Sequence, residues 1–442
     1  MRSESANATN QMKGRTSEAS RASSSSRGPR LGPIAEWPAP LLWTLAWRNL
    51  WRHTRRTLMI LFAFALGVWS MIVIAAISRG SMEQQLDKAI LNLTGHVQIH
   101  APGFRDDPVI EHRFTLPPAG ETALSGNEVT AWARRVRVPG VNGSERDSAG
   151  STLVGIEPEQ ERGLSFIATA VTEGRNLDSP DDQGLLLGRK LAERLETGLG
   201  RRVVLMSQDV HNQVGDRGFR VVGIFDTQPR QMEEAYVFIG RSTAQQMLKL
   251  GGTITEVAVM TGDRDRLEPL LGRLRQAAPG FDIEPWTVIE PLLVLTQKIT
   301  DVILIIWYAI VFAAMSFGLI NTLLMAVFER TREFGLFQSL GMPPRHILGQ
   351  VLVESLILLT LALVLGNLAA WATIVPLMDG IDLSSVAEGM EMIGVAPVIY
   401  PAWSVNDLVA ANLPVFVLGL AASLYPAWRA SRHVPVEALT RI

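Results

Sequence analysis

The sequence contains no cysteine, which excludes disulfide bonds, cysteine nucleophiles and thiolate metal sites. It also contains no Gly-Lys dipeptide and therefore no GxxxxGK[ST] phosphate-binding loop. The HExxH motif of zinc peptidases and the GxSxG motif of serine hydrolases are absent as well. A formal net charge of −2 gives no basic surface for nucleic acid. These absences predict a non-catalytic chain, and the lack of cysteine suits a large domain in an oxidising compartment.

Four long apolar runs without charge dominate the 442 residues, at positions 58–77, 302–328, 355–378 and 408–428. A helix needs about 20 apolar residues to cross the hydrocarbon layer of a membrane. Buried helices of soluble proteins rarely run so far without a charge, so each run predicts a transmembrane helix. The predicted fold class is an α-helical membrane protein with four transmembrane helices. A large α+β extracytoplasmic domain is inserted between the first and second of them.

The charges that flank the spans predict their orientation. Residues 379–406 contain four acidic residues and no Lys or Arg. Short loops rich in Lys and Arg stay in the cytoplasm, so both termini and the loop after the second span are predicted to be cytoplasmic. The arginines that carry this prediction are Arg48, Arg52, Arg55, Arg56, Arg330, Arg332, Arg345, Arg429, Arg432 and Arg441.

The N-terminal region precedes the first span and has two parts. Its first part is rich in Ser, Arg and Gly and predicts a disordered cytoplasmic tail. Its second part places Trp43, Trp47 and Trp51 at helical spacing, which predicts an amphipathic helix in the cytoplasmic interface rather than an extension of the first span. The predicted order of segments is then tail 1–40, interfacial helix 41–56, first span 57–79, external core domain 80–298, second span 299–328, cytoplasmic coupling segment 329–345, third span 346–378, external loop 379–406, fourth span 407–428 and cytoplasmic C-terminus 429–442.

The external domain shows a mixed pattern. Apolar and β-branched runs predict strands at 96–100, 202–206, 219–225 and 255–260, and amphipathic runs predict helices at 185–195, 243–250 and 266–277. Its histidines lack the spacing of a zinc site, and its paired aspartates lie beside Pro and Gly, as in solvated turns. The domain is therefore expected to have two lobes and to bind a partner or transmit force.

The coupling segment 329–345 predicts a short helix that ends at Gly341 and the two prolines that follow. Phe334, Phe337 and Leu340 would share one face of that helix. Apolar anchors ringed by charge are typical of a docking surface. The alternative is a charged loop whose apolar face lies on the membrane. The pattern alone does not separate the two interpretations.

Glu354 is the one charge near the start of the third apolar run. An ionisable residue inside a span suggests a functional site by default. Its closeness to the cytoplasmic edge favours a structural role instead, in which it pairs with Arg345 or with a neighbouring chain. Its neutralisation is then expected to leave ATPase coupling intact.

The segment 321–335 (NTLLMAVFERTREFG), followed by Leu340 and Gly341, closely resembles the signature of FtsX-like ABC permeases. This family includes lipoprotein-releasing permeases and MacB-type exporters. Phe334 departs from its pattern, since an aliphatic residue is usual there. The resemblance extends over residues 41–442 through matching segments at 47–50 (WRNL), 55–57 (RRT), 188–192 (GRKLA), 221–225 (VVGIF), 425–430 (YPAWRA) and 435–439 (PVEAL).

The resemblance implies a mechanotransmission machine. Two such permeases, identical or paired with a relative, would bind two copies of a cytoplasmic ABC ATPase. ATP and Mg would be held by that ATPase, and this chain would bind no cofactor or metal. The outward face of the first span, with Phe64, Val68 and Met71, is our predicted path for a lipid chain. The residues predicted to couple to the ATPase are Glu329, Arg330, Arg332, Glu333, Phe334, Gly335, Leu336, Phe337 and Leu340.

The short segment 94–99 (TGHVQI) resembles the lipoprotein-releasing branch. We therefore expect this chain to extract or release a lipoprotein from the inner membrane, with a periplasmic chaperone as a further partner. One alternative is an efflux or peptide-export permease that works with a tunnel protein. Another is a regulator of a cell-wall hydrolase, against which the large external domain argues.

Overall fold

The computed structural model describes residues 39–227, 230–339, 342–383 and 398–431. Nearly all of the predicted tail, Leu340, and parts of the segments 379–406 and 429–442 lie outside the described residues. The chain divides into two compact units. One comprises Met1–Trp69, Ile310–Ala369 and Val409–Ile442, and the other comprises Ser70–Ala309 and Ala370–Leu408.

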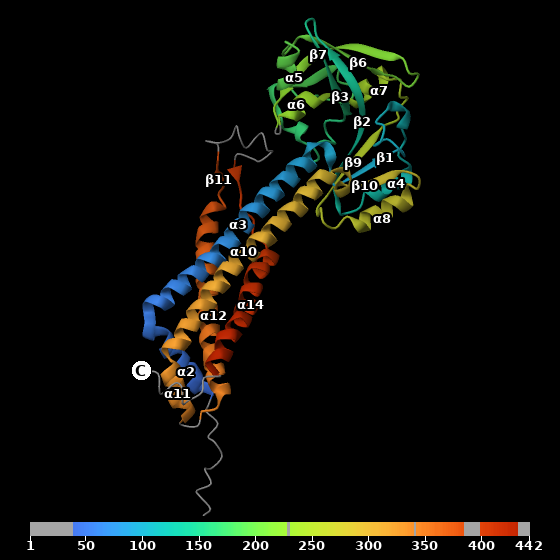
Figure 1. Cartoon of the computed structure of the whole chain (residues 1–442). Coiled ribbons are helices and arrows are strands. Elements are labelled where there is room, and N and C mark those ends of the chain that lie inside the picture. The colour runs from blue at the N-terminus through green and yellow to red at the C-terminus, as the bar shows by residue number, and fades with distance from the viewer. Residues whose placement is uncertain (1–38, 228–229, 340–341, 384–397, 432–442) are drawn as a thin grey trace, which may run out of the picture. The chain divides into compact units, whose positions relative to one another are not determined.

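Four helices of the described chain are long and apolar enough to cross a membrane, which confirms the prediction of four apolar spans (Figure 1). Helix α3 has 36 residues and α10 has 39, so at about 1.5 Å per residue each exceeds the roughly 30 Å of the hydrocarbon layer. Both helices therefore continue well beyond their apolar runs. The four are α3 (Thr54–Ala89), α10 (Pro291–Glu329), α12 (Pro344–Leu377) and α14 (Val405–Ser431).

A separate helix, α2 (Ala39–Leu50), precedes α3 and is joined to it by the 3-10 turn η1 (Trp51–His53). The hydroxyl of Thr57 donates a hydrogen bond of 2.6 Å to the carbonyl of Leu50, which closes this elbow. The amphipathic helix thus ends at Leu50, and residues 54–56 belong to α3 rather than to the predicted segment 41–56. Trp43 and Trp47 are half exposed along α2.

Close helix packing surrounds the middle of α3. A Cβ atom added at Gly67 would lie 2.3 Å from the sulfur of Met315 on α10. One added at Gly366 on α12 would lie 2.8 Å from the Cβ of Val68. Small residues at these positions let neighbouring apolar helices approach closely, which is how helices associate where no hydrophobic effect drives them together.

This packing corrects the predicted lipid path on the first span. Phe64, Val68 and Met71 are 3%, 0% and 1% exposed, so they do not form an outward face. Phe64 lies among residues of α10 and α12, including Leu319 and Leu359. Hydrophobicity alone could not show this, because every face of an apolar helix looks equally suited to lipid.

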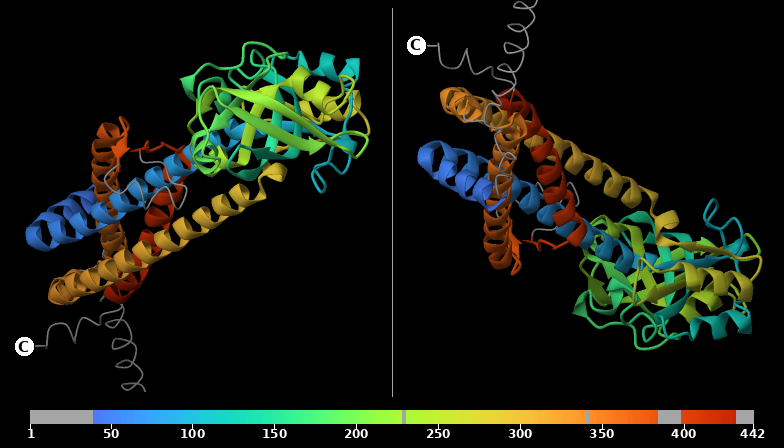
Figure 2. Two further views of the ribbon diagram at one scale, coloured as in Figure 1. Left: turned by 90° about the horizontal axis from the view of Figure 1, so that it is seen from above. Right: turned by 90° about the horizontal axis from the view of Figure 1, so that it is seen from below.

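The external domain contains a ten-stranded sheet in the order β10-β1-β9-β2-β3-β8-β5-β7-β4, with β6 paired to β2 and β7. Figure 2 shows its strands and short helices from two further directions. The strands are β1 (Val97–His100), β2 (Val129–Gly143), β3 (Ser148–Ile156), β4 (Val171–Gly174), β5 (Gly184–Gly188), β6 (Arg202–Gln208), β7 (Val214–Phe225), β8 (Tyr236–Gly240), β9 (Glu256–Thr261) and β10 (Asp282–Pro285).

Separate hydrophobic cores lie along the 15-residue strand β2 and define two lobes, the first beside its N-terminal half and the second beside its C-terminal half. Its first half pairs with β9, and the core there includes Val97, Val259 and Leu274, the last on helix α8 (Glu268–Ala277). Its second half pairs with β3 and β6, and the core there includes Leu187 and Phe219. The shorter helices of the domain are α4 (Pro118–Leu124), α5 (Arg189–Arg194), α6 (Gln231–Ala235), α7 (Arg241–Met247) and α9 (Trp286–Ile289).

The predicted strands all fall on observed strands, but the helix predicted at 185–195 is wrong in its first half. Residues Gly184–Gly188 form β5, which pairs with β7 in parallel and with β8 antiparallel, and all five are buried. A strand buried on both faces reads as a continuous apolar run, which periodicity cannot distinguish from a buried helix. Only Arg189–Arg194 are helical.

Candidate functional site

The coupling segment forms helix α11 (Thr331–Ser339), which follows α10 after one residue. Phe334 is 2% exposed and packs in a cluster with residues of α10, α12 and α14, among them Val327, Val351 and Ala427. Leu336, by contrast, is 52% exposed. The helix therefore presents one side chain to its own bundle and leaves another exposed.

This geometry corrects the predicted docking face. Phe334 is a core residue of the helix bundle and not an exposed anchor, because helical spacing turns it toward α12 and α14. Phe337 is partly buried against the same cluster, and Leu340 lies outside the described residues. Leu336 and Arg332 are the exposed members of the predicted coupling set within α11, whereas Gly335 is buried.

Ion pairs connect α11 and the end of α10 to the start of the chain. Arg52 contacts Glu333 and Arg56 contacts Glu329, each at 2.6 Å. These side chains are largely or partly exposed, so each pair contributes at most about 1 kcal/mol. Their main effect is on position, because they hold α11 beside η1 and α3.

A buried ion pair lies immediately before α11. Arg330 Nη1 donates to Glu354 Oε2 at 3.0 Å, and both side chains are less than 10% exposed. Arg330 Nη2 also donates to the carbonyl of Asn49 at 3.2 Å, at the end of α2. Of the two predicted partners of Glu354, Arg345 is wrong, because it is exposed and Arg330 pairs with Glu354 instead. The pair joins the α10–α11 connection to both α2 and α12.

A second buried charge network lies inside the external domain, on β2. Arg135 is fully buried and forms two hydrogen bonds to Glu161, of 2.7 and 2.8 Å. Its Nη1 donates to Glu256 at 2.9 Å and to the carbonyl of Leu93 at 2.6 Å. Arg137 Nη1 contacts the other oxygen of Glu256 at 3.3 Å. Burial would raise the pKa of Glu256, but the charges of Arg137 and Arg135 hold it below its ordinary value.

Leu93 marks the place where α3 gives way to the external domain. The π-helical turn η2 (Ile90–Thr94) follows α3, and Leu93 adopts a left-handed φ of 74°, which is costly for a branched side chain. Its side chain is buried among Phe225, Phe238 and other residues of the second lobe, whereas Ile90 belongs to the core of the first lobe. The end of α3 is thus anchored in both lobes.

Sequence patterns did not single out Arg135, Glu161 or Glu256. The alternation along the strand could have identified Arg135. Residues two positions apart in a strand point to the same face, so Arg135 lies on the same buried face as Ala133. The two carboxylates come from distant parts of the chain, and only the sheet brings them together.

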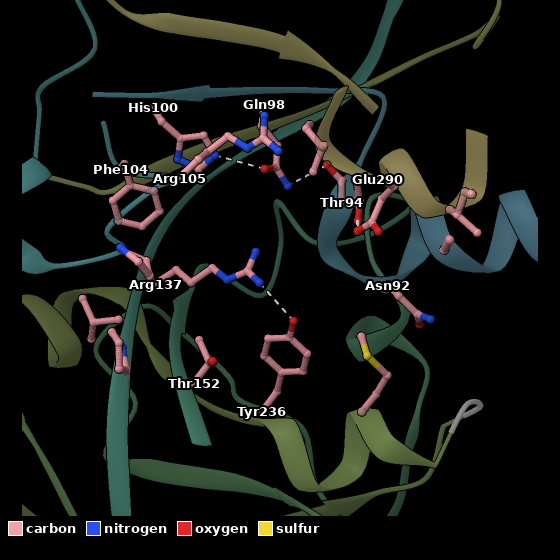
Figure 3. Close-up of a pocket in the computed structure, with 17 residues that line it drawn as sticks. Asn92, Thr94, Gln98, His100, Phe104, Arg105, Arg137, Thr152, Tyr236 and Glu290 are labelled. Atoms are coloured by element: carbon pink, nitrogen blue, oxygen red, sulfur yellow. Dashed lines mark hydrogen bonds between the residues drawn. The ribbon is translucent and has the colours of Figure 1, made fainter. Parts of the chain in front are cut away.

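A cavity of about 460 Å³ opens beside this network (Figure 3). Its wall includes residues of η2, β1, β2, β3 and β8, together with Glu290 and Leu293 around the start of α10. His100 and Gln98 are buried in the wall and share a hydrogen bond of 3.0 Å. Among the described residues, no group of three or more His, Asp or Glu side chains is arranged to hold a metal ion.

Two family descriptions match this sequence. Residues 57–277, half of the chain, match the MacB-like periplasmic core domain, and residues 305–435 match the FtsX-like permease C-terminal domain. The chain belongs to the FtsX-like permeases with a MacB-like periplasmic core domain. This result confirms the family predicted from the 321–335 signature.

Two relatives and one solved structure are similar to this FtsX-like permease. The lipoprotein-releasing system transmembrane protein LolC of Xylella fastidiosa strain 9a5c is 25% identical over 86% of this chain and 92% of the relative. The pyoverdine export ATP-binding/permease protein PvdT of Pseudomonas fluorescens Pf-5 is 24% identical over 92% of this chain and 61% of the relative. The crystal structure of the periplasmic region of MacB from Actinobacillus actinomycetemcomitans aligns with 48% of this chain and 97% of that region, at 18% identity and a TM-score of 0.34. The chain is an ABC transporter permease of the MacB and LolC type.

Proposed function

We propose that this permease is driven by a separate cytoplasmic ABC ATPase and extracts or releases a lipoprotein at the external face of the bacterial inner membrane. The observation that supports coupling to an ATPase is the structure of α11. This short helix exposes Leu336, and it is held against the bundle by the buried Phe334 and by the Arg330–Glu354 pair. A push on such a helix is passed to α3, α10, α12 and α14 rather than absorbed by a loose loop. The lipoprotein part rests on the likeness to LolC proteins over most of their length.

Unpaired polar atoms around α11 support a role in partner binding. Arg330 Nε, Gln338 Nε2, His346 Nδ1 and Gln350 Oε1 are buried and have no hydrogen-bond partner within the described part of the chain. Buried polar atoms are normally satisfied, and those that are not call for an explanation. These atoms would remain unpaired in the free chain if α11 and its surroundings change their contacts when an ATPase binds.

The proposed assembly contains a second permease, identical or related. In its most apolar stretch α10 is only 17% buried and α14 22%, against 50% for α3 and for α12. Along the first half of α10, most of the exposed apolar side chains recur every three or four residues, which leaves one helical face for a partner; Ile305 is also exposed but lies off this face. The side chains on the face are Leu292, Leu295, Ile299, Val302, Ile303, Ile306 and Ile310.

Export with a tunnel protein remains the second candidate function. The observation in its favour is the likeness to PvdT, whose identity to this chain is close to that of LolC. Affinity purification from the native membrane separates the two. Acylated lipoproteins and a second permease beside the ATPase would support release, whereas a tunnel protein would support export.

Replacing Leu336 with Asp is expected to reduce co-purification of the ATPase at least tenfold, because a charge replaces the exposed apolar contact of α11. Leu199→Asp is the matched control, since Leu199 is 49% exposed in the external domain and the change in charge is the same. Quantitative mass spectrometry of the purified complex measures the ratio of ATPase to permease. Equal ratios for Leu336→Asp and the unaltered chain would show that α11 is not the docking site.

A further inference from the structure

We infer that the cavity beside β2 binds a peptide segment that carries an ammonium group next to apolar side chains. This inference rests on the proposed function, in which the substrate is a protein, and it names the part of that substrate which the external domain would recognise. The cavity volume of about 460 Å³ falls within the usual range for ligand pockets. Polar and charged side chains make up about half of its lining and apolar side chains the rest, so it can both orient a ligand and receive apolar groups.

The two arginine side chains on the cavity wall each have a carboxylate partner. Arg105 Nη1 contacts Glu284 Oε2 at 2.6 Å, and its Nη2 donates to the carbonyl of Val288 at 3.0 Å. Arg137 contacts Glu256 at 3.3 Å and donates to the hydroxyl of Tyr236 at 3.0 Å (Figure 3). Each guanidinium therefore already has a carboxylate partner, so the cavity offers no free positive charge for an anionic ligand.

Glu290 differs from the paired charges on this wall. Its carboxylate accepts one hydrogen bond, from the hydroxyl of Thr94 at 3.2 Å. No Lys, Arg or His within the described part of the chain lies within 4 Å of it, and the N-terminus of α10 offers it only a partial positive charge. An uncompensated carboxylate at the edge of a cavity favours a ligand with a cationic group.

The remaining wall suits a polypeptide. Phe104 is stacked on His100, with ring centroids 4.8 Å apart, and Met232, Leu293 and Val138 add apolar surface. Asn92 and Thr152 contribute an amide and a hydroxyl to the same wall (Figure 3). Such groups pair with the main-chain N–H and C=O of a peptide, while the apolar surface receives its side chains.

The position of the cavity connects ligand binding to the long helices. Asn92 and Thr94 belong to η2, where α3 ends, and Glu290 immediately precedes α10. A bound ammonium group would hold Glu290 and Thr94 together. Occupancy of the cavity thereby stabilises one arrangement of the two helix ends, which is how a ligand shifts a conformational equilibrium.

The test uses the purified full-length chain in detergent or nanodiscs and two blocked tripeptides titrated by calorimetry. One probe is acetyl-Leu-Lys-Leu-amide, and the other replaces its lysine by norleucine, which removes the charge and keeps the aliphatic chain. The lysine peptide is expected to bind with a dissociation constant below 1 mM, about tenfold more tightly than the norleucine peptide. Glu290→Gln is expected to abolish this tenfold preference, and Thr152→Trp, which fills the cavity, to abolish binding of both probes.

Glu268→Gln is the matched control, because Glu268 is exposed on α8 and undergoes the same chemical change. A preference for the lysine peptide that is lost in Glu290→Gln and retained in Glu268→Gln supports the site. No saturable binding to the unaltered chain at millimolar peptide, or an unchanged lysine preference in Glu290→Gln, would overturn it. No ATPase is present in this assay, so failure of the cavity inference and failure of ATPase co-purification are separate outcomes.

Discussion

Replacing Arg135 with Met is expected to lower the thermal unfolding midpoint of the external domain by roughly 10 °C. The change leaves Glu161 and Glu256 buried without their shared guanidinium, and breaking a buried ion pair in this way costs about 3–5 kcal/mol. In a domain of this size, about 1 kcal/mol corresponds to roughly 2–4 °C. Met has nearly the length of the arginine stem, so little of the loss comes from a cavity.

Heat unfolding of the purified full-length chain, followed by tryptophan fluorescence, measures this shift, since Trp132 and Trp286 belong to the first lobe. Arg146→Met is the control, because Arg146 and its partner Glu196 are both exposed and the midpoint should not change. A midpoint for Arg135→Met equal to that of the control would mean that the network does not hold the lobes together.

The stability lost in Arg135→Met should depend on pH in a definite direction. The pKa of Glu256 is lowered in the folded chain, so its stabilising contribution is present above its ordinary pKa and is lost as the pH falls through the lowered value. Without Arg135, Glu256 has only Arg137 as a cationic partner, so protonation of Glu256 removes a poorly compensated buried charge instead. The difference in stability between the original chain and the variant should therefore shrink as the pH is lowered from 7 toward 4.

Replacing Glu354 with Ala is expected to produce the second large effect, a loss of about 3–5 kcal/mol in the stability of the helix bundle. Arg330 would keep its charge inside the bundle with the Asn49 carbonyl as its remaining partner. Because Arg330 directly precedes α11, co-purification of the ATPase should fall as well. The expectation based on sequence, that Glu354→Gln leaves ATPase coupling intact, concerns a side chain of similar size and stays a separate prediction.

Unfolding in nanodiscs and the ATPase-to-permease ratio are the two measurements for this pair. A double variant, Arg330→Met with Glu354→Met, should recover most of the lost stability, since apolar residues of similar volume often replace buried ion pairs without loss. Arg52→Ala removes an exposed ion pair to Glu333 and should cost about 1 kcal/mol or less. If Glu354→Ala behaves like Arg52→Ala, the buried pair does not anchor α11.

Parts of the candidate site were predictable because they depend on local patterns. The charged segment between the second and third spans identified the α11 region, and its apolar residues identified a helix. Which of these residues face outward was not predictable. Phe334 and Leu336 are two positions apart and both apolar, and only the neighbouring helices decide that the first is buried and the second exposed.

The sequence by itself determined the four apolar spans, the family and four of the ten strands in the external sheet. These features follow from the length of apolar runs, short motifs and alternation, which are local properties of the chain. Only the tertiary structure decided that Arg135 meets Glu161 and Glu256, that Arg330 meets Glu354, and that the face of α3 with Val68 is buried. Such pairings join residues far apart in the chain, and burial depends on which surfaces the neighbouring elements cover.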